Sequence, residues 1–231
     1  MKMHFQAVLF VMFIWALPTS AQMPTGAFLE AKGATAAVIL AHGRGQDPDS
    51  QVVGPLRRAI NKEIGLHTLS LQMPVLATSD YLAYATTYPD AYKTLQSAID
   101  YLTNEKGVKR IYVMGYSMGA RMTTAFLASR ENPAVVGYIG VGVLQGGGDI
   151  LDANINIHKL TIPVIDIYAD STHLDLSSAQ GRESLVGERY HQVRMRGANH
   201  SFRGYEGALS EAVVAWLKAR EPKQISFNLA R

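Results

Sequence analysis

The 231-residue sequence contains no cysteine. This absence excludes disulfide bonds, a thiol nucleophile, thiolate metal ligands and a lipid-modified N-terminal cysteine. Histidine, aspartate and glutamate do not occur at the spacing of a metal-binding motif such as His-Glu-x-x-His. We therefore predict that the protein uses neither a metal ion nor another cofactor, and that packing alone holds the fold.

Charged residues make up only 18% of the sequence, and the formal net charge is +3. The sequence has no run of Lys and Arg, and no aromatic platform is interleaved with its basic residues. Five arginines cluster within residues 182–203: Arg182, Arg189, Arg194, Arg196 and Arg203. We interpret them as a solvated face rather than a nucleic-acid site. A weak contact with anionic envelope components is left open, and nothing in the sequence indicates an oligomeric state.

The longest apolar block, residues 7–17, is shorter than the ~20 residues that a membrane-spanning helix needs. It follows Lys2 and precedes the small residues 19–21, which is the pattern of a secretory signal peptide. We predict a signal peptide over 1–21 and an exported protein, periplasmic or secreted, formed by one domain over 22–231. The alternative is an N-terminal anchor that is not cleaved.

Downstream of this segment, short apolar runs alternate with segments of helical periodicity. Strands are predicted over 26–32, 36–41, 67–72, 111–114, 135–143, 162–168 and 190–195. Helices are predicted over 53–64, 89–104, 121–127 and 206–220. This alternation favours an α/β fold with a mostly parallel sheet and helices on both faces. The connection over 144–161 is too short for a large lid domain, so we expect an open site.

The fourth predicted strand runs directly into Gly-Tyr-Ser-Met-Gly, residues 115–119, and this turn opens into a helix. A strand, a Gly-x-Ser-x-Gly turn and a helix are typical of the nucleophile elbow of α/β-hydrolases. The glycines allow the tight turn that lifts the serine hydroxyl clear of the sheet. Ser117 is therefore the candidate nucleophile.

A serine hydroxyl needs a base to accept its proton. His200 is the candidate base, because it lies on the loop between the last predicted strand and the last helix. A tetrahedral intermediate also needs N–H donors. We expect the backbone amide of Met118, directly after the nucleophile, to be one donor. The amide of Arg44, on the loop after the strand over 36–41, is the expected second donor.

The acid that would orient this base is the least defined member of the site. Asp170 leaves the end of the strand over 162–168 in the chain order Ser, Asp, His, so we predict it as the acid. Asp175 is a nearby rival and Asp149 a more distant one. Asp166 is predicted to lie too deep within its strand.

At this point the chain resembles the α/β-hydrolase superfamily and, within it, an uncharacterised bacterial group of small exported or envelope-associated members. The resemblance rests on the elbow and on the segments over 40–46, 54–59, 69–76, 163–168 and 197–200. The usual Gly-x-x-Asp of the superfamily would place glycine at Ala169 and the acid at Thr172, and this sequence departs from both. The resemblance implies hydrolysis of an ester-like bond by Ser117 and His200, with Asp170 or Asp175 in place of the usual acid, with an acid from elsewhere, or with an impaired site.

The leading functional hypothesis is a serine hydrolase, a carboxylesterase that forms an acyl-enzyme on a small-molecule ester. Thioesterase and amidase action would use the same groups. The alternative is a non-catalytic envelope or binding protein that keeps the fold. Four tyrosines precede or begin the helix over 89–104: Tyr81, Tyr84, Tyr88 and Tyr92. They are expected either to rim the substrate pocket or to pack on the body of the protein.

Overall fold

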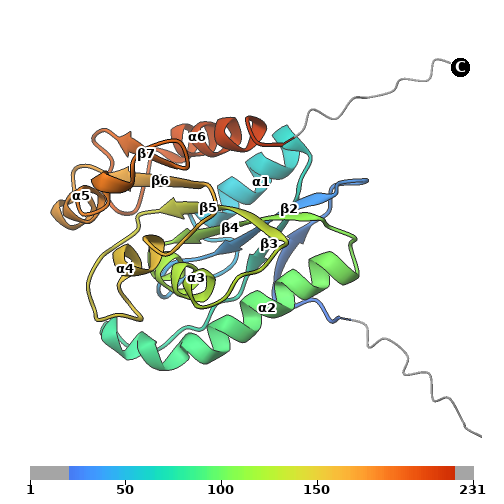
Figure 1. Cartoon of the computed structure of the whole chain (residues 1–231), viewed down its shortest axis with the longest axis horizontal. Coiled ribbons are helices and arrows are strands. Elements are labelled where there is room, and N and C mark those ends of the chain that lie inside the picture. Colours follow the sequence, from blue (N-terminus) through green and yellow to red (C-terminus); the bar gives the residue numbers. More distant parts are fainter. Residues whose placement is uncertain (1–20, 222–231) are drawn as a thin grey trace, which may run out of the picture.

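A computed structural model describes residues 21–221, which fold around a seven-stranded sheet (Figure 1). Its strands are β1 (Gly26–Leu29), β2 (Ala36–Ala41), β3 (His67–Leu71), β4 (Arg110–Tyr116), β5 (Val135–Val141), β6 (Val164–Ala169) and β7 (Tyr190–Met195). They lie in the order β1-β3-β2-β4-β5-β6-β7, with β1 antiparallel to β3 and every other pair parallel. The predicted signal peptide, except Ala21, lies outside the described residues.

Six α-helices and two short 3-10 helices lie between or after these strands within residues 21–221. They are α1 (Val53–Ile64), η1 (Leu82–Thr87), α2 (Tyr88–Asn104), α3 (Met118–Ser129), α4 (Ala153–Ile157), α5 (His173–Gln180), η2 (Glu183–Leu185) and α6 (Glu206–Lys218). The sequence pattern predicted α1, α2, α3 and α6, but α4 and α5 were expected as loops. None of the helices in the described part of the chain is both long and apolar enough to cross a bilayer.

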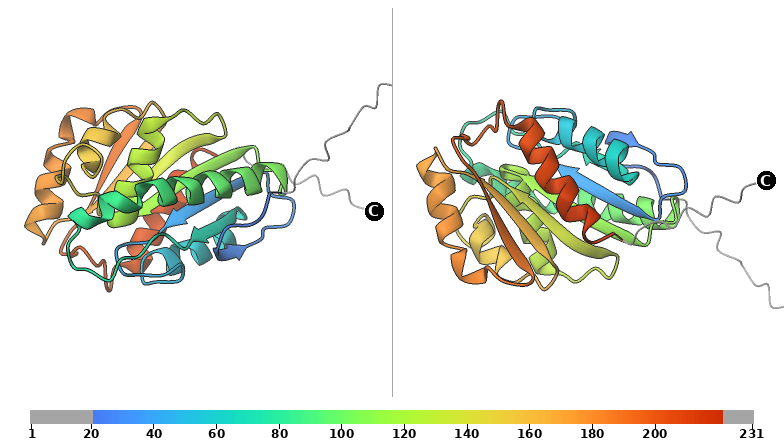
Figure 2. Two further views of the ribbon diagram at one scale, coloured as in Figure 1. Left: turned by 90° about the horizontal axis from the view of Figure 1, so that it is seen from below. Right: turned by 90° about the horizontal axis from the view of Figure 1, so that it is seen from above.

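The sheet is covered on both faces, as predicted, because alternate residues of its strands point in opposite directions. In β2, Ala37 and Ile39 join the apolar cluster that α2 and α3 cover. Val38 and Leu40 join the cluster on the other face, beneath α1 and α6. Figures 1 and 2 show these two helical layers with the sheet between them. The fold is thus a single-domain α/β-hydrolase fold with a mostly parallel sheet.

The parallel strands bring distant segments of the sequence to one edge of the sheet. β2, β4, β5, β6 and β7 all run in the same direction, so the loops that follow them meet at their carboxyl ends. In open α/β sheets this edge is where ligands bind. Ser117 and His200 follow β4 and β7, so both predicted groups lie at this edge.

Candidate active site

Ser117 occupies a strained turn between β4 and α3. Its backbone lies at φ 53° and ψ −113°, a region that residues with a side chain seldom adopt. A Cβ on Gly115 would lie 2.3 Å from Thr123 Oγ1, and one on Gly119 would lie 2.3 Å from the Ala41 carbonyl oxygen. Both positions therefore require glycine, because a side chain at Gly115 would clash with α3 and one at Gly119 would clash with the end of β2.

The Ser117 hydroxyl and the His200 imidazole meet in the folded protein. His200 Nε2 lies 2.8 Å from Ser117 Oγ, although 83 residues separate them in the sequence. The ring of Tyr116 stacks on the imidazole with 5.7 Å between ring centroids, and its hydroxyl donates to the His200 carbonyl at 3.0 Å. Burial, followed by the nearby Asp175 carboxylate, raises the pKa of Tyr116 to about 12, so this hydroxyl stays a donor at neutral pH.

The carboxylate that contacts His200 is Asp175, and the prediction of Asp170 is corrected. Asp175 Oδ1 lies 2.8 Å from His200 Nδ1, and the Asp175 side chain is 1% exposed. Asp170 instead accepts hydrogen bonds from Arg194 Nε at 2.8 Å and from the Gly197 amide at 2.6 Å. These two partners lower the pKa of Asp170 and hold its carboxylate against Arg194 and Gly197.

The two remaining candidate acids lie elsewhere. Asp166 is fully buried in the middle of β6, as predicted, where it pairs with Arg182. Asp149 is exposed on the loop before α4, and its side chain makes no hydrogen bond to His200. Asp175 is therefore the acidic residue that completes a chain of contacts with Ser117 and His200.

A helix explains why the acid is displaced along the sequence. Thr172 stands where the superfamily pattern would put aspartate, and its hydroxyl oxygen accepts the His200 amide at 3.1 Å. Thr172 is also the N-cap of α5, which places Asp175 in the first turn of that helix. A Thr followed three residues later by an acid is a known helix-start signature, so the sequence did contain a signal for this helix.

The two predicted oxyanion donors line the same cavity as Ser117. Met118 is the first residue of α3, so its amide has no acceptor within the helix. Arg44 follows the end of β2, and its amide makes no hydrogen bond to any residue over 21–221. The geometry therefore leaves two backbone N–H groups available at the edge of the cavity that holds the nucleophile.

His42, a residue that sequence reasoning did not assign, fixes the direction of the Arg44 amide. His42 Nε2 accepts the Met73 amide at 3.1 Å, so its proton must be on Nδ1, which lies 2.8 Å from the Gly43 carbonyl oxygen. In a trans peptide the carbonyl and the following N–H point in opposite directions. Holding the Gly43 carbonyl against His42 therefore turns the Arg44 N–H away from His42.

We expect His42→Ala to lower the free energy of unfolding by about 1–3 kcal/mol, because the buried Met73 amide and Gly43 carbonyl lose their partner. Burial lowers the pKa of His42 below its ordinary value of 6.5. The unfolded chain therefore binds more protons than the folded one as the pH falls through 6.5, and the folded protein loses stability there. Urea unfolding at pH 7.5 and 5.5 should show this loss in the wild type.

The same pair of measurements on His42→Ala should show a smaller loss on acidification. His67, whose pKa burial also lowers, is present in both proteins and cancels in the comparison. An equal loss in wild type and variant would contradict the buried neutral imidazole.

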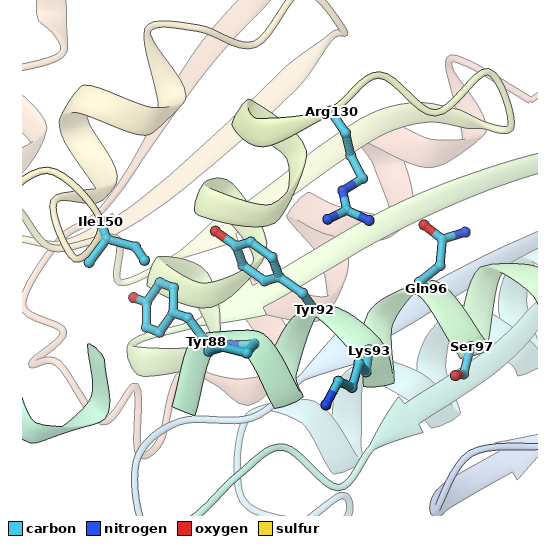
Figure 3. Close-up of a pocket in the computed structure, with 8 residues that line it drawn as sticks. Tyr88, Tyr92, Lys93, Gln96, Ser97, Arg130 and Ile150 are labelled. Atoms are coloured by element: carbon cyan, nitrogen blue, oxygen red, sulfur yellow. The ribbon is translucent and has the colours of Figure 1, made fainter. Parts of the chain in front are cut away.

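The cavity beside Ser117 has a volume of about 450 Å³, a size typical of small-molecule sites. Of the four tyrosines considered for the rim of the substrate pocket, Tyr81 lines this cavity. Tyr84 is fully buried, and its hydroxyl forms hydrogen bonds with the backbone of Leu76. Tyr88 and Tyr92 line a separate cavity beside α2 (Figure 3). That second cavity contains neither Ser117 nor His200.

Within residues 21–221 there is no group of three or more His, Asp or Glu side chains arranged to bind a metal ion. The side chains and backbone of the site supply the following groups. An imidazole contacts a strained serine hydroxyl, a buried carboxylate contacts the other ring nitrogen, and two N–H groups lie nearby.

Comparison with known proteins supports the architecture. Residues 34–143 match a family model described as an alpha/beta hydrolase domain. This match and the fold together identify residues 34–143 as similar to α/β-hydrolase domains. A search of proteins with curated functions found no match to this sequence.

Several solved structures share the fold of this protein. Dienelactone hydrolase from Anabaena variabilis is similar with a TM-score of 0.67 at 19% identity, over 87% of this chain and 95% of that one. Est1E from Butyrivibrio proteoclasticus is similar with a TM-score of 0.65 at 15% identity, over 83% and 91%. A serine hydrolase without a lid from Xanthomonas campestris has a TM-score of 0.58 at 17% identity, over 84% and 86%. At these identities the likeness shows the fold.

Proposed function

We propose that this protein is a serine hydrolase that cleaves small carboxylic esters through an acyl-enzyme. The observation that carries the proposal is the continuous chain of contacts from Ser117 Oγ to His200 Nε2, and from His200 Nδ1 to Asp175 Oδ1, each 2.8 Å long. Hydroxyl, imidazole and carboxylate in this order are the parts that activate a serine nucleophile.

In the proposed reaction, Ser117 Oγ attacks the ester carbonyl while His200 Nε2 takes the hydroxyl proton. Asp175 holds the Nδ1–H and stabilises the imidazolium that forms. The amides of Met118 and Arg44 donate to the oxyanion. His200 then gives its proton to the leaving alcohol, and the ester bond breaks. A water molecule attacks the acyl-enzyme by the same route and releases the acid.

Two further observations support this function. The structurally similar proteins include a dienelactone hydrolase and Est1E, which was solved with ferulic acid bound. The non-catalytic alternative rested on the missing acid of the superfamily pattern, and Asp175 supports catalysis by occupying the expected place beside His200. From the pattern of residues 1–21 and the resemblance to small exported bacterial proteins, we infer that the enzyme acts in the periplasm or outside the cell.

We expect a fluorophosphonate probe to label the wild-type chain, because the reagent reacts with an activated serine. Mass spectrometry should locate the adduct on Ser117, and Ser117→Ala should not be labelled. Ser97→Ala, which changes an exposed serine in α2, serves as the matched control and should be labelled like the wild type. A wild-type chain that neither takes up the probe nor hydrolyses p-nitrophenyl esters of any acyl length would overturn the proposal.

A further inference from the structure

The cavity beside Ser117 is lined by two arginines and by no acidic residue. Arg44 and Arg121 are the cations of the lining, and none of its residues is Asp or Glu. Arginine keeps its proton in proteins, so both guanidinium groups are permanent cations. A ligand in this cavity therefore meets an excess of positive charge that no lining side chain offsets.

Arg121 is the more constrained of the two cations. It lies one turn along α3 from the nucleophile, its amide donates to the Ser117 carbonyl at 3.2 Å, and the residue is only 4% exposed. Its Nη atoms donate to backbone carbonyls, among them that of Gln145 at 2.8 Å, and its guanidinium lies 5.2 Å from the centroid of the Tyr81 ring. Nε makes no hydrogen bond to residues over 21–221 and Nη2 makes one, so two N–H donors are left over.

Arg182, which is also buried, has a carboxylate partner that Arg121 lacks. Arg182 is 0% exposed and is neutralised by the Asp166 carboxylate, with Nη2 to Oδ2 at 2.8 Å. No carboxylate within residues 21–221 lies within ion-pair distance of Arg121. A buried charge is costly unless it is paired. Arg121 therefore carries a desolvated cation whose hydrogen-bond partners are neutral, and the Asp152 carboxylate acts on it only through space.

Arg44 adds a second cation to the lining of this cavity. Its side chain is exposed, and Nη1 donates to the Ser79 carbonyl, which is again a neutral acceptor. The remainder of the cavity wall is partly apolar, with Leu144 and Leu174 contributing to it. Together these features describe a small site with a nucleophile, a short apolar wall and two cations.

We propose that the natural substrate is a small ester that carries a free carboxylate, and that Arg121 and Arg44 bind this carboxylate while Ser117 attacks the ester. The planar guanidinium matches a carboxylate in shape as well as in charge. This inference rests on the proposed hydrolase function and adds the class of substrate to it.

Paired substrates test the inference on the full-length protein. Monomethyl succinate, glutarate and adipate are compared with methyl butanoate, pentanoate and hexanoate, which have similar lengths but no charge, and methanol release is measured. Acetoxybenzoate against phenyl acetate places the carboxylate on the alcohol side instead. We expect the carboxylate member of at least one pair to have the higher kcat/KM, by about tenfold to a hundredfold, as expected for hydrogen bonds to charged groups.

Two charge-removing variants assign the preference to the arginines. Arg121→Gln and Arg44→Gln should each lower the ratio of kcat/KM for carboxylate over neutral ester, mainly through KM of the carboxylate ester. Arg44→Gln keeps its backbone amide and provides the test if Arg121→Gln perturbs the loop that Arg121 holds. Arg130→Met is the matched control, because it removes one cation from the separate cavity of Figure 3 and should leave the ratio unchanged.

The outcomes separate this inference from the proposed function. Hydrolysis of neutral and carboxylate esters at equal rates, or preference for the neutral ones, would overturn the carboxylate subsite and leave the serine hydrolase intact. The carboxylate subsite would also be overturned if the wild-type preference for carboxylate esters stayed the same in both arginine variants. The same holds if both variants lowered kcat/KM equally for carboxylate and neutral esters. Absence of turnover and of fluorophosphonate labelling would overturn the hydrolase function itself.

Discussion

Replacing Asp175 with Asn is expected to lower kcat by about 10⁴-fold, as loss of the carboxylate does in other Ser-His-Asp sites. Asp175 is 1% exposed and its Oδ1 contacts His200 Nδ1 at 2.8 Å. Asparagine keeps the shape of the side chain but removes the negative charge that stabilises the imidazolium. Because no substrate group contacts Asp175 in the proposed reaction, KM should change little. Ester hydrolysis under saturating substrate measures the effect.

Asp170→Asn is the matched control for this variant, since the same change is made five residues away in a carboxylate that faces Arg194 and Gly197. We expect it to retain turnover within a few-fold of the wild type. The melting temperatures of both variants should be recorded so that unfolding is not mistaken for loss of catalysis. Normal turnover in Asp175→Asn, or a 10⁴-fold loss in Asp170→Asn, would contradict the assignment.

Arg182→Met is expected to lower the free energy of unfolding by about 3–5 kcal/mol, because it leaves the buried Asp166 carboxylate without its counter-ion. Arg182 lies just after α5 and donates to both oxygens of Asp166, at 3.0 Å and 2.8 Å. It also donates to the Val143 carbonyl at 3.2 Å. These bonds tie the end of α5 to β6 and to the segment that follows β5, so we also expect lower activity, since α5 carries Asp175. Urea unfolding measures the stability change.

Arg194→Met is the matched control, because it breaks an Arg–Asp pair at the surface, in which the arginine side chain is 53% exposed and the Asp170 side chain 10% exposed. Such surface pairs contribute about 0–1 kcal/mol. Adding Asp166→Asn to Arg182→Met removes the uncompensated charge, so the double variant should recover part of the lost stability. A double variant less stable than Arg182→Met, or an equal cost for the two single arginine variants, would contradict a buried ion pair.

Two further side chains donate hydrogen bonds to the buried Asp166 carboxylate. Tyr190 donates its hydroxyl to Asp166 Oδ2 at 2.7 Å, and burial together with this carboxylate raises the pKa of Tyr190. Gln192 Nε2 donates to the same oxygen at 3.2 Å and to the Ala179 carbonyl in α5 at 2.8 Å. Asp166 lies too deep in β6 to contact His200. It therefore acts indirectly, because it anchors α5, the helix that carries Asp175 to His200.

The sequence by itself determined the fold class, the strained turn that presents Ser117 and the loop that presents His200. These features depend on local chemistry: glycines where no Cβ fits, apolar runs where a strand is covered on both faces, and the order of elements along the chain. Parallel strands then bring loops distant in sequence to one edge, so the meeting of Ser117 and His200 follows from topology alone.

Only the tertiary structure decided which carboxylate contacts His200 and where positive charge gathers. Asp170 and Asp175 are five residues apart, and both follow β6. The choice between them depends on Arg194 and Gly197 holding one, and on α5, anchored through Arg182, carrying the other to the imidazole. In the same way, Arg121 becomes an unpaired cation only because of what packs around it. Burial and pairing are properties of neighbours across the fold, which no local pattern records.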